Sequence, residues 1–171
     1  WGNTLKETDF TGIEASYTYD AMGNITSATD GVGATKRVAY DAAYRAVELV
    51  ERNGAKSLQA FDAAGRLTST TDALGYAEAY TYDATGNIVS FTDKDGYISQ
   101  LEYDSLARII AAIDANGNTT SYTYDAAGNI TAVTDATGAT ETYTYDSEGQ
   151  LVGHTDAAGN NETYEYDIMG N

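Results

Sequence analysis

The chain has 171 residues, enough for one domain with a core, and it lacks Cys, which excludes disulfides, thiolate chemistry and Cys-ligated metals. Its net charge is −17 and its 9 Lys and Arg residues form no cluster, which argues against nucleic acid or an anionic membrane as a partner. No apolar run approaches membrane-spanning length, so we expect no membrane span.

In chain order, the sequence repeats one pattern with a period of 21 residues. An aromatic residue followed by Asp recurs at Tyr19-Asp20, Tyr40-Asp41, Phe61-Asp62, Tyr82-Asp83, Tyr103-Asp104, Tyr124-Asp125, Tyr145-Asp146 and Tyr166-Asp167. A second acidic column comprises Asp9, Asp30, Glu51, Asp72, Asp93, Asp114, Asp135 and Asp156, each followed three residues later by Gly. The first column is followed in the same way by Gly23, Gly65, Gly86, Gly128, Gly149 and Gly170, but by Tyr44 and Ala107 in two repeats.

Each repeat therefore holds two Asp-x-x-Gly turns about ten residues apart. Asp suits the first position of a type I turn, and Gly at the fourth supplies the positive φ that closes a hairpin with a bulge. Between turns the residues alternate, as in 122–124 and 130–134, which predicts β-strands rich in aromatic and β-branched residues. Residues 42–54 are the one passage that resembles a helix, but their in-phase turn residues favour strands.

The fold predicted is an all-β, antiparallel meander over residues 1–171, with two strands in each of about eight repeats. In the hairpin after Tyr19, that residue should oppose Ile25. Opposed residues share a face, and the period is odd, so two identical turns would place Tyr40 on the opposite face from Tyr19. We therefore predict two different turn geometries.

With that correction, the tyrosines gather on one face of the sheet. This face is predicted to hold Tyr17, Tyr19, Ile25, Tyr80, Tyr82, Ile88, Tyr103, Ile109, Tyr122, Tyr124, Ile130, Tyr143, Tyr145, Leu151, Tyr164 and Tyr166. The other is predicted to hold Thr18, Thr26, Thr81, Val89, Thr123, Thr131, Val133 and Thr144. Because other large apolar residues are sparse, the 15 tyrosines are the predicted core. So many strands rarely form an open twisted sheet, and we expect this one to curl into a tube or shell.

The motif YxYDxxG, followed by Asn, Arg or Gln and then Ile or Leu, resembles the YD repeat of the Rhs family. It is carried by residues 17–25, 80–88, 122–130 and 143–151, whereas 103–109 lacks the glycine and 40–46 lacks the glycine and the aliphatic residue. The resemblance covers nearly the whole chain. It implies a β-sheet shell, in known relatives a hollow cocoon, within large secreted or surface proteins such as insecticidal toxin complexes and teneurins.

Two features depart from the Rhs family. Rhs toxins end their repeats with a Pro-rich core box and a self-cleavage site, which a chain without Pro cannot contain. The invariant period suits a uniform tube or fibre better than a tapering cocoon.

The chain starts at Trp1, and residues 1–3 are in phase with 169–171, so we expect a segment of a longer repeat protein.

Catalysis would need an activated nucleophile near a base. The only histidine, His154, occupies a strand position where other repeats have Ala112 or Val133, which indicates a structural strand residue. We predict no catalytic residues and no enzyme.

Calcium coordination is the one metal-binding role that we weigh against hydrogen bonding within turns for the Asp and Asn residues of the second column. Asp93, Asp95, Asp114, Asn116 and Asn118 are spaced like alternating oxygen ligands, but no bidentate Glu follows them. Turn chemistry is favoured, so we predict no metal and no cofactor. A thermal melt with and without a chelator tests this, since an unchanged midpoint removes calcium from the account.

The predicted function is architectural: the wall of an extracellular or cell-surface tube, filament or shell, with neighbouring repeats or identical copies end to end as partners. One alternative is part of a cocoon enclosing a toxin cargo. Another is an adhesin whose tyrosine rows bind glycans, which a glycan array would detect. The predicted structural residues are Tyr19, Tyr40, Phe61, Tyr82, Tyr103, Tyr124, Tyr145, Tyr166, Asp20, Asp83, Asp125, Gly23, Gly86, Gly128, Gly33, Gly75 and Gly138.

Overall fold

The computed structural model describes residues 4–8, 12 and 14–167, and within them it contains β-strands and turns but no helix. The strands are β1 Thr4–Thr8, β2 Glu14–Tyr19, β3 Ile25–Thr29, β4 Thr35–Tyr40, β5 Ala46–Val50, β6 Lys56–Phe61, β7 Leu67–Thr71, β8 Ala77–Tyr82, β9 Ile88–Thr92, β10 Ile98–Tyr103, β11 Ile109–Ile113, β12 Thr119–Tyr124, β13 Ile130–Thr134, β14 Thr140–Tyr145, β15 Leu151–Thr155 and β16 Asn161–Thr163. No membrane-crossing helix is therefore present in the described part of the chain. The repeat positions Asp9 and Gly170, and the in-phase ends 1–3 and 169–171, lie outside the described residues.

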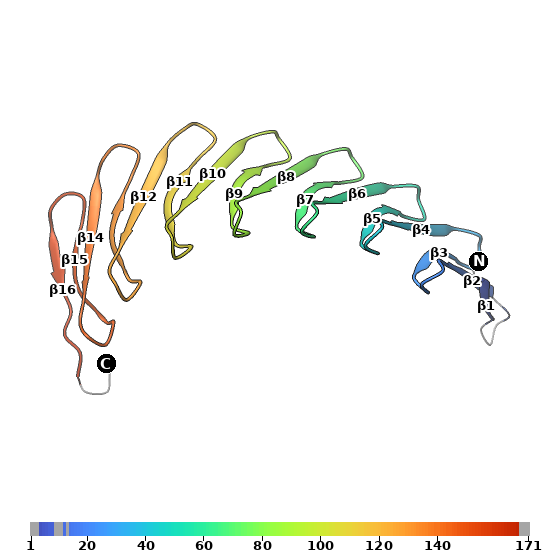
Figure 1. The fold of residues 1–171 in the computed structure, drawn as a ribbon, viewed down its shortest axis with the longest axis horizontal. Helices are drawn as coiled ribbons and strands as arrows, with labels where there is room; N and C mark the ends of the chain where they lie inside the picture. Colours follow the sequence, from blue (N-terminus) through green and yellow to red (C-terminus); the bar gives the residue numbers. More distant parts are fainter. Residues whose placement is uncertain (1–3, 9–11, 13, 168–171) are drawn as a thin grey trace. The chain divides into compact units, whose positions relative to one another are not determined.

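The chain divides into two compact units. Unit 1 comprises residues 1–80 and 92–96, and unit 2 comprises residues 81–91 and 97–171, so β8 and β9 straddle the division. In unit 1 the strands follow chain order up to β8, and in unit 2 from β9 to β16 (Figure 1). Neighbouring strands pair antiparallel, as in β2 with β3 and β12 with β13. The predicted all-β meander is confirmed, and residues 42–54 form β5 with a turn on each side.

Two sets of turns join the strands. The YD turns are residues 20–24, 41–45, 62–66, 83–87, 104–108, 125–129 and 146–150; the DG turns are residues 30–34, 51–55, 72–76, 93–97, 114–118, 135–139 and 156–160. In a meander every second turn lies at the same ends of the strands, so each set forms its own row along each unit.

The two sets have the same backbone geometry, so the prediction of two turn geometries is wrong. In the YD turn, Gly23 N–H donates to Asp20 O (3.1 Å) and Asp20 N–H donates to Asn24 O (2.9 Å). The DG turn repeats both bonds, from Gly33 to Asp30 (2.9 Å) and from Asp30 to Ala34 (3.0 Å). The glycines of both sets have positive φ, for example +88° at Gly23 and +84° at Gly33.

A β-bulge beside six of the seven YD turns resolves the odd period instead. Tyr19 opposes Ile25 as predicted, but the next residue back, Thr18, opposes Ser27, so Thr26 is an extra residue in β3. The same shift occurs beside Tyr40, Phe61, Tyr103, Tyr124 and Tyr145. The strand pairs β3–β4 and β13–β14, which are joined by DG turns, keep a continuous register. One extra residue per repeat restores the parity of the two faces, because side chains alternate with a period of two.

The bulge also determines which side chains share a face. Thr18 Oγ1 lies 2.8 Å from Thr26 Oγ1 and 2.6 Å from Ser27 Oγ, so both bulge residues lie on the face opposite the tyrosines. After the bulge the alternation resumes one residue later. Val133 therefore opposes Tyr122 on the tyrosine face, and its predicted place on the threonine face is wrong.

The predicted tyrosine core is not a buried core. Contacts between strands are confined to neighbours in the sheet, so each unit is a single layer. In the described part of the chain only Ala111, the second bulge residue of β11, counts as buried, with 9% of its surface exposed. The strand tyrosines are half-buried, and none of them is fully buried. Burial of such a face requires a second layer, and neither unit contains one.

Candidate functional site: the row of YD turns

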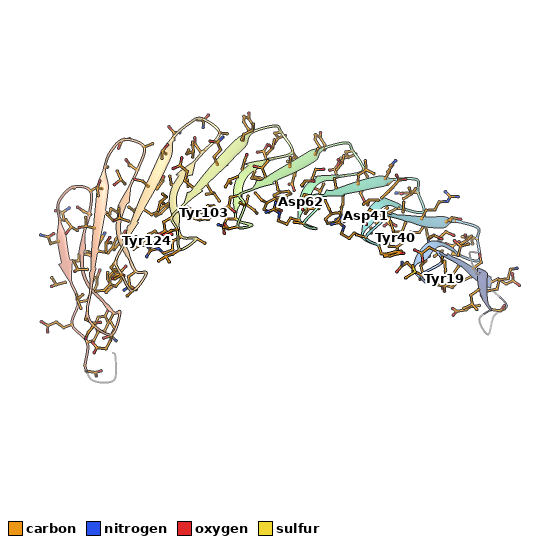
Figure 2. The ribbon with its side chains drawn as sticks, in the orientation of Figure 1. Tyr19, Tyr40, Asp41, Asp62, Tyr103 and Tyr124 are labelled. Atoms are coloured by element: carbon orange, nitrogen blue, oxygen red, sulfur yellow. The ribbon has the colours of Figure 1, made fainter. Side chains whose placement is uncertain are left out.

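The YD turns bring together the side chains that recur in the sequence. Tyr40, Asp41 and Asp62 lie along one end of the strands in unit 1, and Tyr103 and Tyr124 lie at the corresponding strand ends in unit 2 (Figure 2). From Tyr19 to Tyr145, each aromatic residue of this column ends an even-numbered strand, and the Asp that follows it begins a turn.

The Asp side chain organises its own turn. In residues 20–24, Asp20 Oδ1 accepts the N–H groups of Met22 and Asn24 (both 2.9 Å), and Oδ2 accepts the Asn24 side-chain amide (2.9 Å). These bonds stabilise the charged carboxylate and lower the pKa of Asp20 from its ordinary value, with the Asn24 amide as the largest cause. The amide of Asn129 lowers the pKa of Asp125 in the same way.

Three YD turns carry Arg in place of this Asn. The Nε atoms of Arg45, Arg66 and Arg108 donate to the Oδ2 atoms of Asp41, Asp62 and Asp104, each at 2.7 Å. The largest cause of the lowered pKa of these three carboxyls is the backbone N–H of the same arginine, and the guanidinium adds to it.

Arginine also connects one repeat to the next. Arg108 donates from Nη1 to the backbone oxygen of Asp125 (3.1 Å), and its guanidinium carbon lies 4.5 Å from the centroid of the Tyr124 ring. Arg45 makes the equivalent contacts in unit 1, with Asp62 O at 3.4 Å and the Phe61 ring at 4.7 Å. Arg45 and Arg108 thus each join their own carboxylate, the next aromatic ring and the next turn.

The tyrosine hydroxyls form a second connection, in the opposite direction along the chain. Tyr124 O–H donates to the backbone oxygen of Ile109 in the preceding repeat (2.7 Å). The same bond runs from Tyr40 to Ile25 (2.9 Å), from Tyr103 to Ile88 (2.9 Å) and from Tyr166 to Leu151 (2.8 Å). The accepting residue is the one immediately before the bulge. Phe61 has no hydroxyl to make this bond.

Two YD turns keep their geometry without glycine. Tyr44 and Ala107 both have a φ of +61°, in the left-handed region that L-residues enter at a cost of about 1–2 kcal/mol. Their N–H groups still donate to Asp41 O and Asp104 O, each at 3.0 Å.

The residues considered as calcium ligands form hydrogen bonds within their own DG turns. Asp114 Oδ1 accepts the N–H groups of Asn116 and Asn118 (both 2.8 Å), and Oδ2 accepts the Asn118 side-chain amide (2.8 Å). Asp93 Oδ1 accepts the N–H of Asp95 (2.9 Å). No group of three acidic, His or Cys side chains suited to a metal occurs among the described residues.

His154 lies in β15 on the tyrosine face, opposite Tyr143. Its ring stacks on Tyr143 with centroids 5.0 Å apart, Nε2 lies 3.4 Å from Glu141 Oε2, and Nδ1 lies 3.8 Å from Glu162 Oε2. The hydroxyl of Tyr143 donates to the same Glu141 oxygen (2.7 Å), which raises the pKa of Tyr143 from its ordinary value. His154 therefore packs against Tyr143 and the two glutamates on the neighbouring strands of the sheet.

The remaining predicted residues occupy the turn positions that need a positive φ or a side-chain acceptor. Gly86 and Gly128 in YD turns, and Gly75 and Gly138 in DG turns, have positive φ. Asp83 accepts bonds from its own turn, chiefly the Thr85 hydroxyl, which lowers its pKa well below the ordinary value. Sequence reasoning included the fifth turn residue in the motif but missed its bond to the Asp side chain, and it missed the bulge. The recurrence of Asn, Arg or Gln four residues after Asp was the available signal for the first.

Comparisons with known proteins agree with this arrangement. The family described as teneurin YD-shell matches residues 51–171, and the RHS repeat matches residues 1–35. No curated protein matches the chain.

Similar solved structures include the TcdB2-TccC3-TEV crystal structure, with 18% identity and a TM-score of 0.58 over 99% of this chain and 11% of that chain. The Photorhabdus luminescens Tc holotoxin pore has 20% identity and a TM-score of 0.58, over 99% and 11%. The TcdB2-TccC3-Cdc42 crystal structure has 20% identity and a TM-score of 0.57, over 97% and 11%. This chain spans 11% of the length of each, and the likeness shows the fold. With a family match over more than half of its residues, the chain belongs to the teneurin YD-shell family.

Proposed function

We propose that this chain is a non-enzymatic structural segment of YD repeats that forms the wall of an extracellular tube, filament or shell. The observation that carries the proposal is the connection made in both directions along the row of YD turns. Tyrosine hydroxyls reach back to the preceding repeat, and arginines reach forward to the next. A wall built in this way grows by simple addition of repeats, and its extent follows the number of repeats.

The sheet itself supports the same role. Each 21-residue repeat adds two strands that pair with the strands beside them. Each unit is a single layer with two open faces, which is the form expected of a wall that curls and separates two spaces.

A second candidate is a part of a cocoon that encloses a toxin cargo, and the similar solved structures favour it. One is described as a Tc holotoxin pore, and others are described as TcdB2-TccC3 structures. Under this candidate the repeats of this chain would supply 11% of a much longer shell protein.

Electron microscopy of the native source distinguishes the two. Continuous tubes or filaments of uniform width are the result expected of the first candidate. Closed particles of one fixed size support the cocoon. Soluble protein with no assembled wall of either kind contradicts both.

A further inference from the structure

We infer that the YD turn at residues 146–150, together with the Tyr166 ring, binds an arginine side chain of a basic partner segment. The inference concerns a binding site and does not depend on whether the wall is a tube or a cocoon. Its basis is a binding geometry that the chain itself uses twice elsewhere.

The chain's own arginines define this geometry. Arg108 lies between the Oδ2 atom of Asp104, which accepts its Nε–H at 2.7 Å, and the Tyr124 ring at 4.5 Å. Arg45 lies in the same way between Asp41 and the Phe61 ring at 4.7 Å. A turn carboxylate and the aromatic residue of the next repeat therefore form a binding site, here called a seat, for one guanidinium.

Asp146 and Tyr166 supply the same two groups, a turn carboxylate and the ring of the next repeat, but no arginine of the described part of the chain lies between them. Asp146 Oδ1 accepts the N–H groups of Glu148 (3.0 Å) and Gln150 (2.8 Å), as in the other turns. The Gln150 side chain, unlike Asn129, does not close the turn: Asn129 donates to Asp125 Oδ2 at 2.9 Å, and no described side chain donates to Asp146 Oδ2. Within the described part of the chain no cation lies over the Tyr166 ring.

The surroundings of this turn are more acidic than those of the other YD turns. A groove here is lined by Asp146, Glu148, Glu165 and Asp167 around Gln150 and Tyr166. Other YD turns have Met, Ala, Thr or Leu where Glu148 stands. No described cation forms an ion pair with Asp146, Glu148 or Glu165.

These features favour arginine over lysine and a segment over a single residue. A planar guanidinium can stack on Tyr166 while it donates to Asp146, as Arg108 does at its own seat, whereas an ammonium cannot do both equally well. The groove is open to solvent, where one ion pair contributes only about 0–1 kcal/mol. Binding therefore requires further cations of the same segment at Glu148 and Glu165.

The test uses an acetylated, amidated tetra-arginine peptide and the 171-residue chain at about 0.15 M salt, where long-range attraction is screened. NMR titration reports on the Tyr166 ring. We expect the peptide to shift these signals, and we expect tetra-lysine to bind more weakly.

Three variants make the test specific. Gln150→Arg supplies the chain's own guanidinium to the seat and should weaken peptide binding about tenfold. Ala136→Arg, in an exposed DG turn, changes the net charge equally and should leave the affinity within about twofold. Asp146→Asn, which keeps the shape of the turn, should weaken binding as Gln150→Arg does.

Equal weakening by Gln150→Arg and Ala136→Arg would show general charge attraction and overturn the inference. It would also be overturned by undiminished binding to Asp146→Asn, or by a titration that leaves the Tyr166 signals unmoved.

Discussion

The YD turns with glycine and those without it have the same hydrogen bonds but different residues at the position of positive φ. Gly128 has a φ of +98° and Ala107 a φ of +61°, and both donate to the oxygen of their turn Asp. Arginine as the fifth turn residue occurs in both kinds of turn: Arg45 and Arg108 in the glycine-free turns and Arg66 in the glycine turn at 62–66. The glycine turn at 125–129 carries Asn129 instead. The turn is therefore imposed by strand pairing and by Asp, and glycine lowers the cost of adopting it.

Substitution of a glycine turn should have the largest effect. Gly128→Val places a β-branched residue at positive φ, where nothing lies within 4 Å of an added Cβ, so the cost is conformational. We expect a loss of about 2–3 kcal/mol in the free energy of unfolding. Urea denaturation measures it, with Ala127→Val in the same turn as the control. Equal losses in the two variants would contradict the role of φ.

The reverse change should relieve a glycine-free turn. Ala107→Gly removes the cost of an L-residue at a φ of +61° and should raise the free energy of unfolding by about 1 kcal/mol. The shift in urea midpoint relative to the unaltered chain measures the gain. A loss of stability would mean that the Ala107 side chain contributes more than its backbone conformation costs.

Loss of the connecting arginine should have a comparable or smaller effect. Arg108→Asn retains a donor for Asp104 but removes the contacts with the Tyr124 ring and Asp125 O, and should cost about 1 kcal/mol. Thermal denaturation is suitable, with Arg37→Asn on an exposed strand position as the control. If the two variants lose equal stability, the connection between repeats has no energetic role.

The tyrosine hydroxyl should matter less. Tyr124→Phe removes only the bond to Ile109 O and should cost about 0.5–1 kcal/mol. Phe61→Tyr makes the opposite change in the one described repeat with Phe at this position. A gain there and a loss at Tyr124 in urea denaturation would support the bond; the opposite signs would argue against it.

Protonation of a single turn carboxylate should have the smallest effect on the free energy of unfolding. Six YD-turn carboxyls, at Asp20, Asp41, Asp62, Asp83, Asp104 and Asp125, have pKa values lowered from 3.8. Their stabilisation is present above pH 3.8 and is lost as the pH falls through the lowered values. The pKa values of Tyr143 and Tyr164 are raised from 10.0, so their contribution is lost as the pH rises beyond that value. Urea midpoints should therefore be level between these limits, and a maximum below pH 3 would contradict the assignment.

Much of the fold was predictable because turn chemistry is local. Asp20, Gly23 and their repeats specify hairpins through bonds within five residues, and the alternation between turns specifies strands. The bulge was not predictable from the sequence. An odd repeat length can keep the tyrosines on one face through an extra residue either in a turn or in a strand, and the sequence does not distinguish the two. The wrong face for Val133 followed from that choice.

The candidate site was only partly predictable. The tyrosines and aspartates repeat visibly, but the roles of Arg45 and Arg108 depend on contacts with the next repeat, about sixteen residues away. The expected buried core failed for a similar reason, because burial depends on a second layer that the repeat pattern does not describe.

The extra residue beside each YD turn limits how a gene for such a wall can change. Loss or gain of one codon between Ile25 and Thr29 would turn every later ring to the opposite side, while removal of a whole 21-codon cassette would leave the alternation intact. Such genes should therefore tolerate duplication and deletion in complete cassettes, and lose function with single-codon insertions inside a strand.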